Sequence, residues 1–218
     1  MKCLVYVLGL IEYGESCRMQ RQLMRMRMAD SIPDVLLLLE HPPTLTVGKT
    51  GRIENILTSA EQLRKEGISL FFSDRGGDVT YHGPGQMVAY PILSLKNRGK
   101  DVHLYVHNLE EVVIRTLKDF AIDADRDKNH PGVWIDRKEI AAIGLRIEKW
   151  TTMHGLALNV NSNLSHFSLI NPCGFTERKV TSMSKILGRE MSMETVISRF
   201  IPHFSEIFET VMESGSPA

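Results

Sequence analysis

The sequence has few cysteines and no excess of charge of either sign. Its 218 residues contain 3 cysteines, and 26 Lys and Arg balance 26 Asp and Glu. The cysteines form no C-x-x-C pair and no Cys/His cluster with zinc spacing, which argues against a disulfide framework and a metal site. A net charge of zero gives no sign of nucleic-acid binding by the chain as a whole. We therefore expect free thiols, no bound metal and no nucleic-acid partner.

Long hydrophobic runs are also lacking. No apolar stretch reaches the ~18 residues that a transmembrane helix needs. The first residues, MKCLVYVLGLI, carry one lysine and are not followed by a small-residue cleavage site, so they do not fit a signal peptide. These absences predict no membrane contact and a cytoplasmic location. The length suits a single catalytic domain over residues 1–213, with a frayed tail over residues 214–218.

The spacing of apolar residues predicts both strands and helices. The expected strands cover residues 3–10, 34–40, 44–47, 68–72, 87–95, 133–135, 140–146 and 154–160. The expected helices cover residues 12–29, 58–67, 101–120 and 193–212. We expect the first strand to be buried, Thr58 and Glu61 to form a capping box, and Val211 to lie on the apolar stripe of the last helix. Strands and helices do not alternate regularly, which favours an α/β (α+β) domain with a mixed sheet flanked by helices.

The stretch RGGDVTYHGPGQ, residues 75–86, combines closely spaced glycines with polar side chains. Glycine permits positive φ and close approach of a ligand to the backbone. The spacing fits neither G-x-x-x-x-G-K-[ST] nor G-x-G-x-x-G, so this is not a standard phosphate-binding loop. Two interpretations remain: a pair of tight turns between strands, or a backbone cradle whose donors are Arg75, Thr80, Tyr81, His82 and Gln86.

Two expected strands, IAAIGLR (140–146) and HGLALNV (154–160), carry small residues where strands usually carry bulky ones. Small residues on a sheet allow a helix to pack closely against it. Alternatively, they leave room for a groove that accepts an elongated apolar ligand.

Cys173 lies in NPCGF, residues 171–175, between a proline and a glycine. This context is typical of a turn, where a thiol is accessible. Reactivity requires that a cation, a histidine or a helix N-terminus lower the thiol pKa. Cys3 and Cys17 lie in apolar patterns, and we interpret them as structural or incidental.

These stretches, together with EHPPTLTVG (40–48) and the extension of the glycine loop through MVAYPIL, resemble in order and spacing the octanoyltransferases of lipoate biosynthesis, the lipoyl(octanoyl) transferases. The resemblance runs from the first strand to about residue 190 and implies the fold of biotin and lipoate protein ligases. It implies that octanoyl-acyl carrier protein is the donor. The implied acceptor is a lysine of a lipoyl domain, as in 2-oxoacid dehydrogenases and the glycine cleavage H protein.

The resemblance also implies a set of site residues. Cys173 would carry the octanoyl group as an acyl-thioester, which keeps the acyl group activated, so that neither ATP nor a metal is expected. The acyl-binding residues carried over from the family lie in the glycine loop and the two small-residue strands. They are Arg75, Gly76, Gly77, Asp78, Val79, Thr80, Tyr81 and His82, then Ala142, Ile143 and Gly144, and finally His154, Gly155, Leu156 and Ala157.

One position departs from the family. The family has a lysine directly before its Ile-Ala-Ala-Ile-Gly strand, whereas this chain has Glu139 there and Lys138 one residue earlier. A carboxylate near the cysteine would raise its pKa, and an ammonium group would lower it. Three interpretations follow: a bulge lets Lys138 reach the site, Glu139 faces the site and His82 or His154 activates the thiol, or the protein is a weak or altered transferase.

Other functions remain open on the sequence alone. An ATP-dependent lipoate-protein ligase would not need Cys173, and a catalytically weak acyl-protein binding module is favoured only by Glu139. A cysteine hydrolase would need Cys173 paired with His82 or His154. The arginines on residues 12–29 form either a solvated helix face or a docking face for an acidic partner such as the carrier protein.

Overall fold

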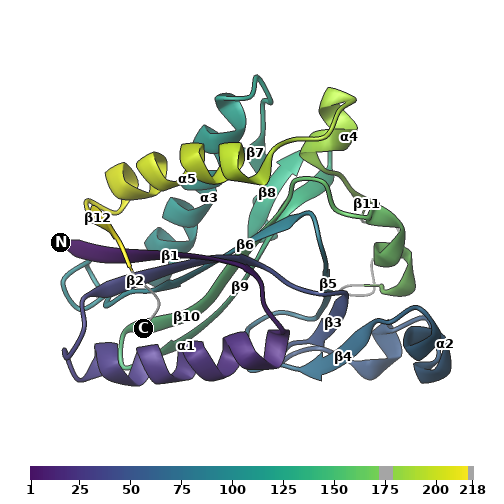
Figure 1. The fold of residues 1–218 in the computed structure, drawn as a ribbon, viewed down its shortest axis with the longest axis horizontal. Coiled ribbons are helices and arrows are strands. Elements are labelled where there is room, and N and C mark those ends of the chain that lie inside the picture. The colour runs from purple at the N-terminus through teal and green to yellow at the C-terminus, as the bar shows by residue number, and fades with distance from the viewer. Residues whose placement is uncertain (172–178, 216–218) are drawn as a thin grey trace.

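The structure is a computed structural model that describes residues 1–171 and 179–215 (Figure 1). Its helices are α1 (Tyr13–Met28), α2 (Ala60–Lys65), α3 (Val102–Lys118), α4 (Met183–Leu187) and α5 (Met193–Ile207), with 3₁₀ turns η1 (Ile53–Asn55) and η2 (Leu164–Leu169). Its strands are β1 (Lys2–Leu10), β2 (Asp34–Glu40), β3 (Thr44–Val47), β4 (Ser69–Phe72), β5 (Val79–His82), β6 (Gln86–Ile92), β7 (Asp125–Arg126), β8 (Gly132–Ile135), β9 (Lys138–Glu148), β10 (Thr151–Asn159), β11 (Lys179–Val180) and β12 (Val211–Ser214).

A large mixed sheet forms the centre of the fold. Its strand order is β12-β1-β2-β6-β10-β9-β8-β7, and β11 pairs with β9. β1 runs parallel to both β2 and β12, and β11 runs parallel to β9, whereas the remaining neighbours are antiparallel. The predicted mixed sheet is therefore confirmed.

Helices cover both faces of the large sheet. α3 and α5 lie over one face, and α1 lies along the other (Figure 1). The run DVLLLLE in β2 follows from this arrangement, because Leu36 and Leu38 pack in the core on the α3 and α5 side, whereas Leu37 and Leu39 pack in the core on the α1 side. A strand buried on both faces has no polar alternation.

A smaller sheet, in the order β4-β3-β5, lies beside the large one and packs on its own core with Leu63 of α2. β5 pairs with β3 in this small sheet, whereas β6 lies in the large sheet. The chain passes from one sheet to the other through Gly83–Gly85, and Gly85 has φ +81°. The glycine loop thus contains a strand and joins two sheets, so the interpretation of a simple pair of tight turns does not describe it.

Two details near the ends of α2 and β1 differ from expectation. Ser59, not Thr58, caps α2, since its Oγ accepts a hydrogen bond of 3.1 Å from the Gln62 N–H. In β1 only Cys3 is fully buried, and the other residues are half-buried or exposed; the strand lies one position from the edge of the sheet.

The C-terminal region also differs. α5 contains Pro202, as expected, but it ends at Ile207, and the chain returns as the edge strand β12. Val211 is therefore 66% exposed instead of part of a helical stripe. The predicted tail begins too early, because β12 extends to Ser214 and the Gly215 N–H donates to Val5 O at 2.8 Å. Residues 216–218 lie outside the described residues.

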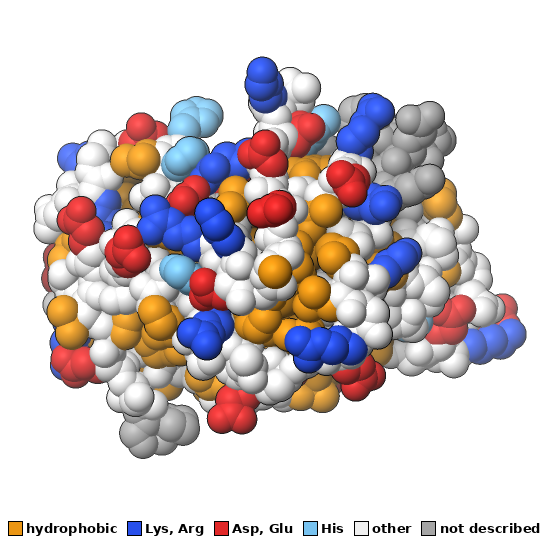
Figure 2. Space-filling model, turned by 90° about the horizontal axis from the view of Figure 1, so that it is seen from above, with side chains coloured by type: hydrophobic (Ala, Val, Ile, Leu, Met, Phe, Trp, Pro, Cys, Tyr) orange, Lys and Arg blue, Asp and Glu red, His pale blue; other side chains and the backbone are white. Residues whose placement is uncertain are grey.

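Charges of both signs are distributed over the face shown in Figure 2, with a band of hydrophobic side chains near its middle. This face has no continuous stripe of one sign, in keeping with the balanced composition. In residues 1–171 and 179–215, no helix combines the length and the apolar character that crossing a membrane requires.

Candidate active site

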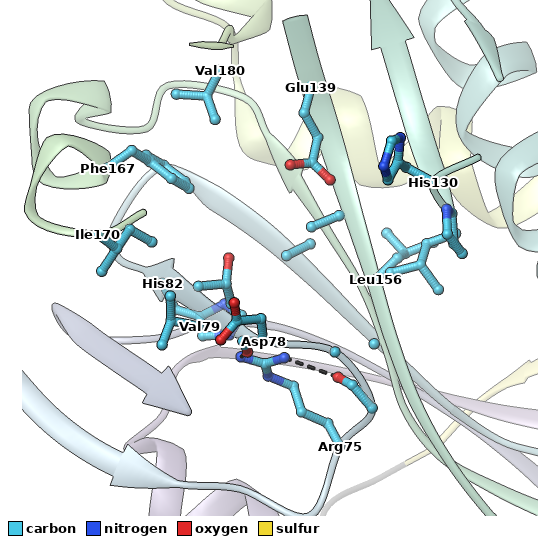
Figure 3. Close-up of a pocket in the computed structure, with 18 of the residues that line it drawn as sticks. Arg75, Asp78, Val79, His82, His130, Glu139, Leu156, Phe167, Ile170 and Val180 are labelled. Atoms are coloured by element: carbon cyan, nitrogen blue, oxygen red, sulfur yellow. Dashed lines mark hydrogen bonds between the residues drawn. The ribbon is translucent and has the colours of Figure 1, made fainter. Parts of the chain in front are cut away.

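A cavity of about 860 Å³ lies between the glycine loop and the β9 and β10 strands (Figure 3). This volume lies within the ~300–1,000 Å³ that is typical of small-molecule sites. The wall is mainly apolar. Its described lining includes Val79, Ala142, Ile143, Gly144, Leu156, Ala157, Phe167, Ile170 and Val180, together with polar groups at both ends.

The small residues of β9 and β10 serve two purposes. Gly76 N–H donates to Leu145 O at 2.7 Å, and a Cβ on Gly144 would lie 3.1 Å from Gly76 O, so Gly144 lets the glycine loop pack on β9. A side chain on Gly155 would clash with Ala89 O of β6. Ala142 and Ala157, in contrast, line the cavity and leave its space open. The cavity interpretation therefore applies to Ala142 and Ala157, whereas Gly144 and Gly155 make room for the glycine loop and for β6 and not for a helix.

Arg75 stabilises the loop from inside. It is buried and donates to Thr46 Oγ1, and to the carbonyl oxygens of Thr46 at 2.8 Å, Gly76 at 2.9 Å and Asp78 at 2.7 Å. Burial lowers the pKa of its guanidinium group. Arg75 contributes to the cavity wall, but it donates these hydrogen bonds to neighbouring protein groups, so its main effect is to fix the shape of the loop.

The other loop residues divide between two sides. Gly76, Gly77, Asp78, Val79, Thr80 and His82 line the cavity. The Asp78 carboxylate also accepts from Asn55 Nδ2 at 2.6 Å. Tyr81 is not part of the described lining: it packs in the core of the small sheet, and its hydroxyl contacts His166 Nδ1 at 2.7 Å. Adjacent residues of a strand point to opposite sides, which separates Tyr81 from His82.

His82 is buried at the closed end of the cavity. Its Nδ1 donates to Gln86 Oε1 at 2.8 Å, and its ring stacks on Tyr13 with a centroid distance of 5.5 Å. Burial lowers its pKa well below the usual value, so the imidazole is neutral at pH 7. Its Nε2 has no hydrogen-bond partner among the described residues.

His154 lies beside it and has φ +60°, a left-handed conformation that is uncommon within a strand. Its N–H donates to Gln20 Oε1 at 2.8 Å, and its Nε2 donates to Asp74 Oδ1 at 2.7 Å. Arg146 and Arg21 also contact Asp74. Burial lowers the pKa of His154 despite the opposing effect of Asp74, whose own pKa is lowered by the hydrogen bond from His154. Neither His82 nor His154 therefore supplies a positive charge at pH 7.

A β-bulge determines whether Lys138 or Glu139, the two residues at the position where this chain differs from the family, faces the cavity. Trp134 pairs with Glu139 and Val133 pairs with Ala141, so Ile140 is an extra residue in β9. Ile140 and Ala141 both pack in the core on the α3 and α5 side, as expected at a bulge. Ala142 pairs with Gly132 and Glu139 pairs with Trp134, and these two partners lie two residues apart on β8, on one face. Glu139 therefore lies on the same face of β9 as Ala142 and Gly144.

A bulge, which the first of the three interpretations required, is thus present, but it brings Glu139, as in the second interpretation, and not Lys138 to the cavity face. In Figure 3 the Glu139 carboxylate points into the cavity. Lys138 is exposed and contributes to the rim. The side chain of Ile143, which we expected to contact the acyl group, also packs against the core on the α3 and α5 side.

Sequence reasoning missed three residues near the site: Asp74, His130 and Lys185. Asp74 orients His154, whereas His130 and the exposed Lys185 line the cavity. Asp74 directly precedes Arg75 in the sequence, and this position next to the glycine loop was the only sign that Asp74 could lie at the site. Lys185 lies on α4, where no motif pointed to it.

Cys173 lies outside the described residues. Asn171, the last described residue before that gap in the chain, and Val180, the second described residue after it, both line the cavity. Cys3 and Cys17 are buried, and burial raises their pKa values to about 12 and about 11, which disfavours reactivity and fits a structural or incidental role. Across residues 1–171 and 179–215, no group of three or more His, Cys, Asp or Glu side chains could hold a metal ion.

The arginines of α1 are not all available to a partner. Arg21 contacts Asp74 at 3.3 Å, and Arg27 donates to Asp34 and Asp30. Arg18 and Arg25 are exposed. At most two of the four arginines thus present their charge outward without an ion pair in the described structure.

Comparison with known proteins gives one consistent result. A family model described as "Lipoyl protein ligase A/B catalytic domain" matches residues 12–205. A protein of Desulforamulus reducens named "Octanoyltransferase" is 48% identical over 210 residues, which cover 96% of this chain and 92% of the relative. An "Octanoyltransferase" of Solibacter usitatus is 46% identical, with 98% of this chain and 96% of the relative covered.

The fold also matches solved structures. A structure described as a bi-partite lipoate protein ligase and its E2 lipoyl domain from Thermoplasma acidophilum has a TM-score of 0.77 at 16% sequence identity, and covers 100% of this chain and 88% of that chain. At this identity the likeness shows a common fold.

Proposed function

The chain belongs to the family of lipoyl protein ligase A/B catalytic domains and is an octanoyltransferase, an acyltransferase of lipoate biosynthesis, and we propose that it takes its octanoyl group from octanoyl-acyl carrier protein. The proposed acceptors are lysines in the lipoyl domains of 2-oxoacid dehydrogenases and the glycine cleavage H protein. The observation that supports this proposal is an apolar cavity whose wall includes Asn171 and Val180, on either side of the segment that contains Cys173.

The proposed reaction has two steps. The Cys173 thiolate attacks the carbonyl carbon of the donor thioester, a new C–S bond forms, and the carrier leaves as a thiolate that takes up a proton. The neutral amine of the acceptor lysine then attacks the Cys173 thioester. The amine nitrogen loses a proton, the C–S bond breaks, and Cys173 is released as the octanoyl amide forms.

This chemistry defines the test of the proposed function. Because the thioester already activates the acyl group, the proposal includes no ATP and no metal. A purified lipoyl domain is incubated with the enzyme and either octanoyl-acyl carrier protein plus EDTA, or octanoate plus ATP and Mg²⁺. We expect octanoylation of the lipoyl domain, measured by intact mass, only from the carrier-protein donor. Transfer only from octanoate with ATP would instead identify a ligase.

The charges around the cavity suggest how the thiol is activated. His82 and His154 are neutral at pH 7, whereas Lys138 and Lys185 line the cavity and are exposed. We propose that these two lysines supply the positive charge that favours the Cys173 thiolate, and that the Glu139 carboxylate opposes it.

Removing the charge of Lys138 or of Lys185 should therefore lower the rate of acyl-enzyme formation, and the size of the loss should depend on pH. Lys138→Met and Lys185→Met are each expected to slow acylation of the enzyme about tenfold at pH 7, since one unit of thiol pKa changes the thiolate fraction about tenfold. The loss should shrink at pH 9, where the thiol ionises without help. Glu139→Gln should have the opposite effect and raise the rate a few-fold at pH 7. The measurement is the initial rate of acyl-enzyme formation by quenched-flow mass spectrometry.

Lys149→Met is the matched control, because Lys149 lies in the turn between β9 and β10, outside the described cavity lining. Its rate should equal that of the wild type at both pH values. A loss of equal size at pH 7 and pH 9 in both cavity-lysine variants would contradict an electrostatic role for these lysines.

A further inference from the structure

The two ends of the cavity differ in exposure. At one end, Leu57 is 62% exposed, and Lys138 and Lys185 are exposed as well. At the other end, the lining residues Tyr13, His82, Tyr90 and His154 are between 1% and 5% exposed. The first end is therefore the mouth, and these four residues form the cavity floor.

Hydrogen bonds hold the cavity floor in place. Tyr13 Oη and Ser73 Oγ share a hydrogen bond of 2.8 Å. His41 lies behind the floor, where its Nδ1 donates to Ile11 O at 2.6 Å, which leaves Nε2 to accept from the Tyr90 hydroxyl at 2.8 Å. The aromatic rings also contact one another, so no ring can swing aside without breaking several interactions.

His154 is held particularly firmly. Its left-handed backbone conformation is uncommon for a residue other than glycine, although histidine, asparagine and aspartate adopt it more often than other residues do. Gln20 binds its N–H, and Asp74 binds its Nε2. The surrounding structure thus maintains a strained residue at the closed end of the cavity.

The cavity floor is polar, whereas the walls above it are apolar. His82 donates through Nδ1 and His154 donates through Nε2, so the remaining nitrogen of each ring is an acceptor. These acceptors, His82 Nε2 and His154 Nδ1, are buried without a hydrogen-bond partner in the described part of the chain. An apolar group pressed against them cannot satisfy either nitrogen, which makes such contact unfavourable.

We propose that this polar floor sets the length of the acyl chain that the enzyme transfers. Methylene groups gain free energy while they contact the apolar walls. The terminal carbons of a chain longer than octanoyl would have to lie against the two imidazole nitrogens and the fixed rings. This inference rests on the proposed function, and it assigns chain-length specificity to His82 and His154.

The test compares octanoyl-, decanoyl- and dodecanoyl-acyl carrier protein as donors. For the wild type we expect the transfer rate to fall at least tenfold from octanoyl to dodecanoyl. His82→Leu replaces the polar ring with an apolar side chain of similar size. His154→Asn shortens the side chain and retains a residue that tolerates positive φ. Each variant should reduce the octanoyl-to-dodecanoyl rate ratio at least threefold.

Leu57→Ala is the control, because it changes the mouth and not the cavity floor, and it should alter all three rates by the same factor. An unchanged ratio in both floor variants, shown to be folded by circular dichroism, would overturn the inference. So would a wild-type enzyme that uses dodecanoyl as fast as octanoyl, a result that needs no variant and leaves the proposed function intact. Failure of the wild type to transfer any of the three groups would instead count against the proposed function.

Discussion

Cys173→Ala is expected to reduce octanoyl transfer by at least about a thousandfold, because the proposed reaction passes through a covalent thioester that alanine cannot form. The direct measurement is intact mass after the enzyme is mixed with octanoyl-acyl carrier protein in the absence of a lipoyl domain. The wild type should gain the mass of one octanoyl group, and Cys173→Ala should gain none.

The two remaining cysteines provide matched controls. Cys3 and Cys17 are buried, and their pKa values are raised by burial, so neither thiol is ionised at pH 7. Cys3→Ala and Cys17→Ala should both keep the octanoyl adduct. If Cys173→Ala formed the octanoyl adduct in the same yield as the wild type, Cys173 would not be the nucleophile, and another residue would have to carry the acyl group.

Arg75→Met is expected to lower the free energy of unfolding by about 2–4 kcal/mol, which is the range for leaving several buried hydrogen-bond acceptors unsatisfied. The guanidinium group binds Thr46 Oγ1 and three carbonyl oxygens from two segments of the small sheet and loop. Methionine fills a similar volume but offers no donor. Arg75→Lys should also destabilise, because a single ammonium group cannot reproduce the planar arrangement of five N–H groups.

Urea denaturation followed by circular dichroism measures this effect. Arg18→Met is the control: Arg18 is exposed on α1, and the change should alter the free energy of unfolding by less than about 0.5 kcal/mol. If Arg75→Met unfolds at the same urea concentration as the wild type but binds octanoate less tightly, Arg75 is a ligand-binding residue and not a structural one.

Much of the fold could be predicted from local sequence signals. The helix α3 begins where the sequence predicts, because Asp101 accepts hydrogen bonds from the N–H groups of His103 and Leu104. The strand expected over residues 34–40 is present as β2, and its uninterrupted apolar run fits its burial on both faces of the sheet. The end of α5 was not predictable in this way, because Val211 continues the apolar spacing of the helix although the chain has already turned into β12.

The family, the mixed sheet and the stretches that surround the cavity could be predicted before folding was considered, because they depend on residue spacing within short segments. Which side chains meet depends on how the chain folds. One extra residue in β9 brings Glu139 to the cavity face. Side chains alternate between the two faces of a strand, so a single inserted residue reverses the face to which the residues before it point. The contacts of Asp74 with His154 and of Arg75 with Thr46 join residues 80 and 29 positions apart. No local pattern specifies such contacts, because they join segments that only the folded chain brings together.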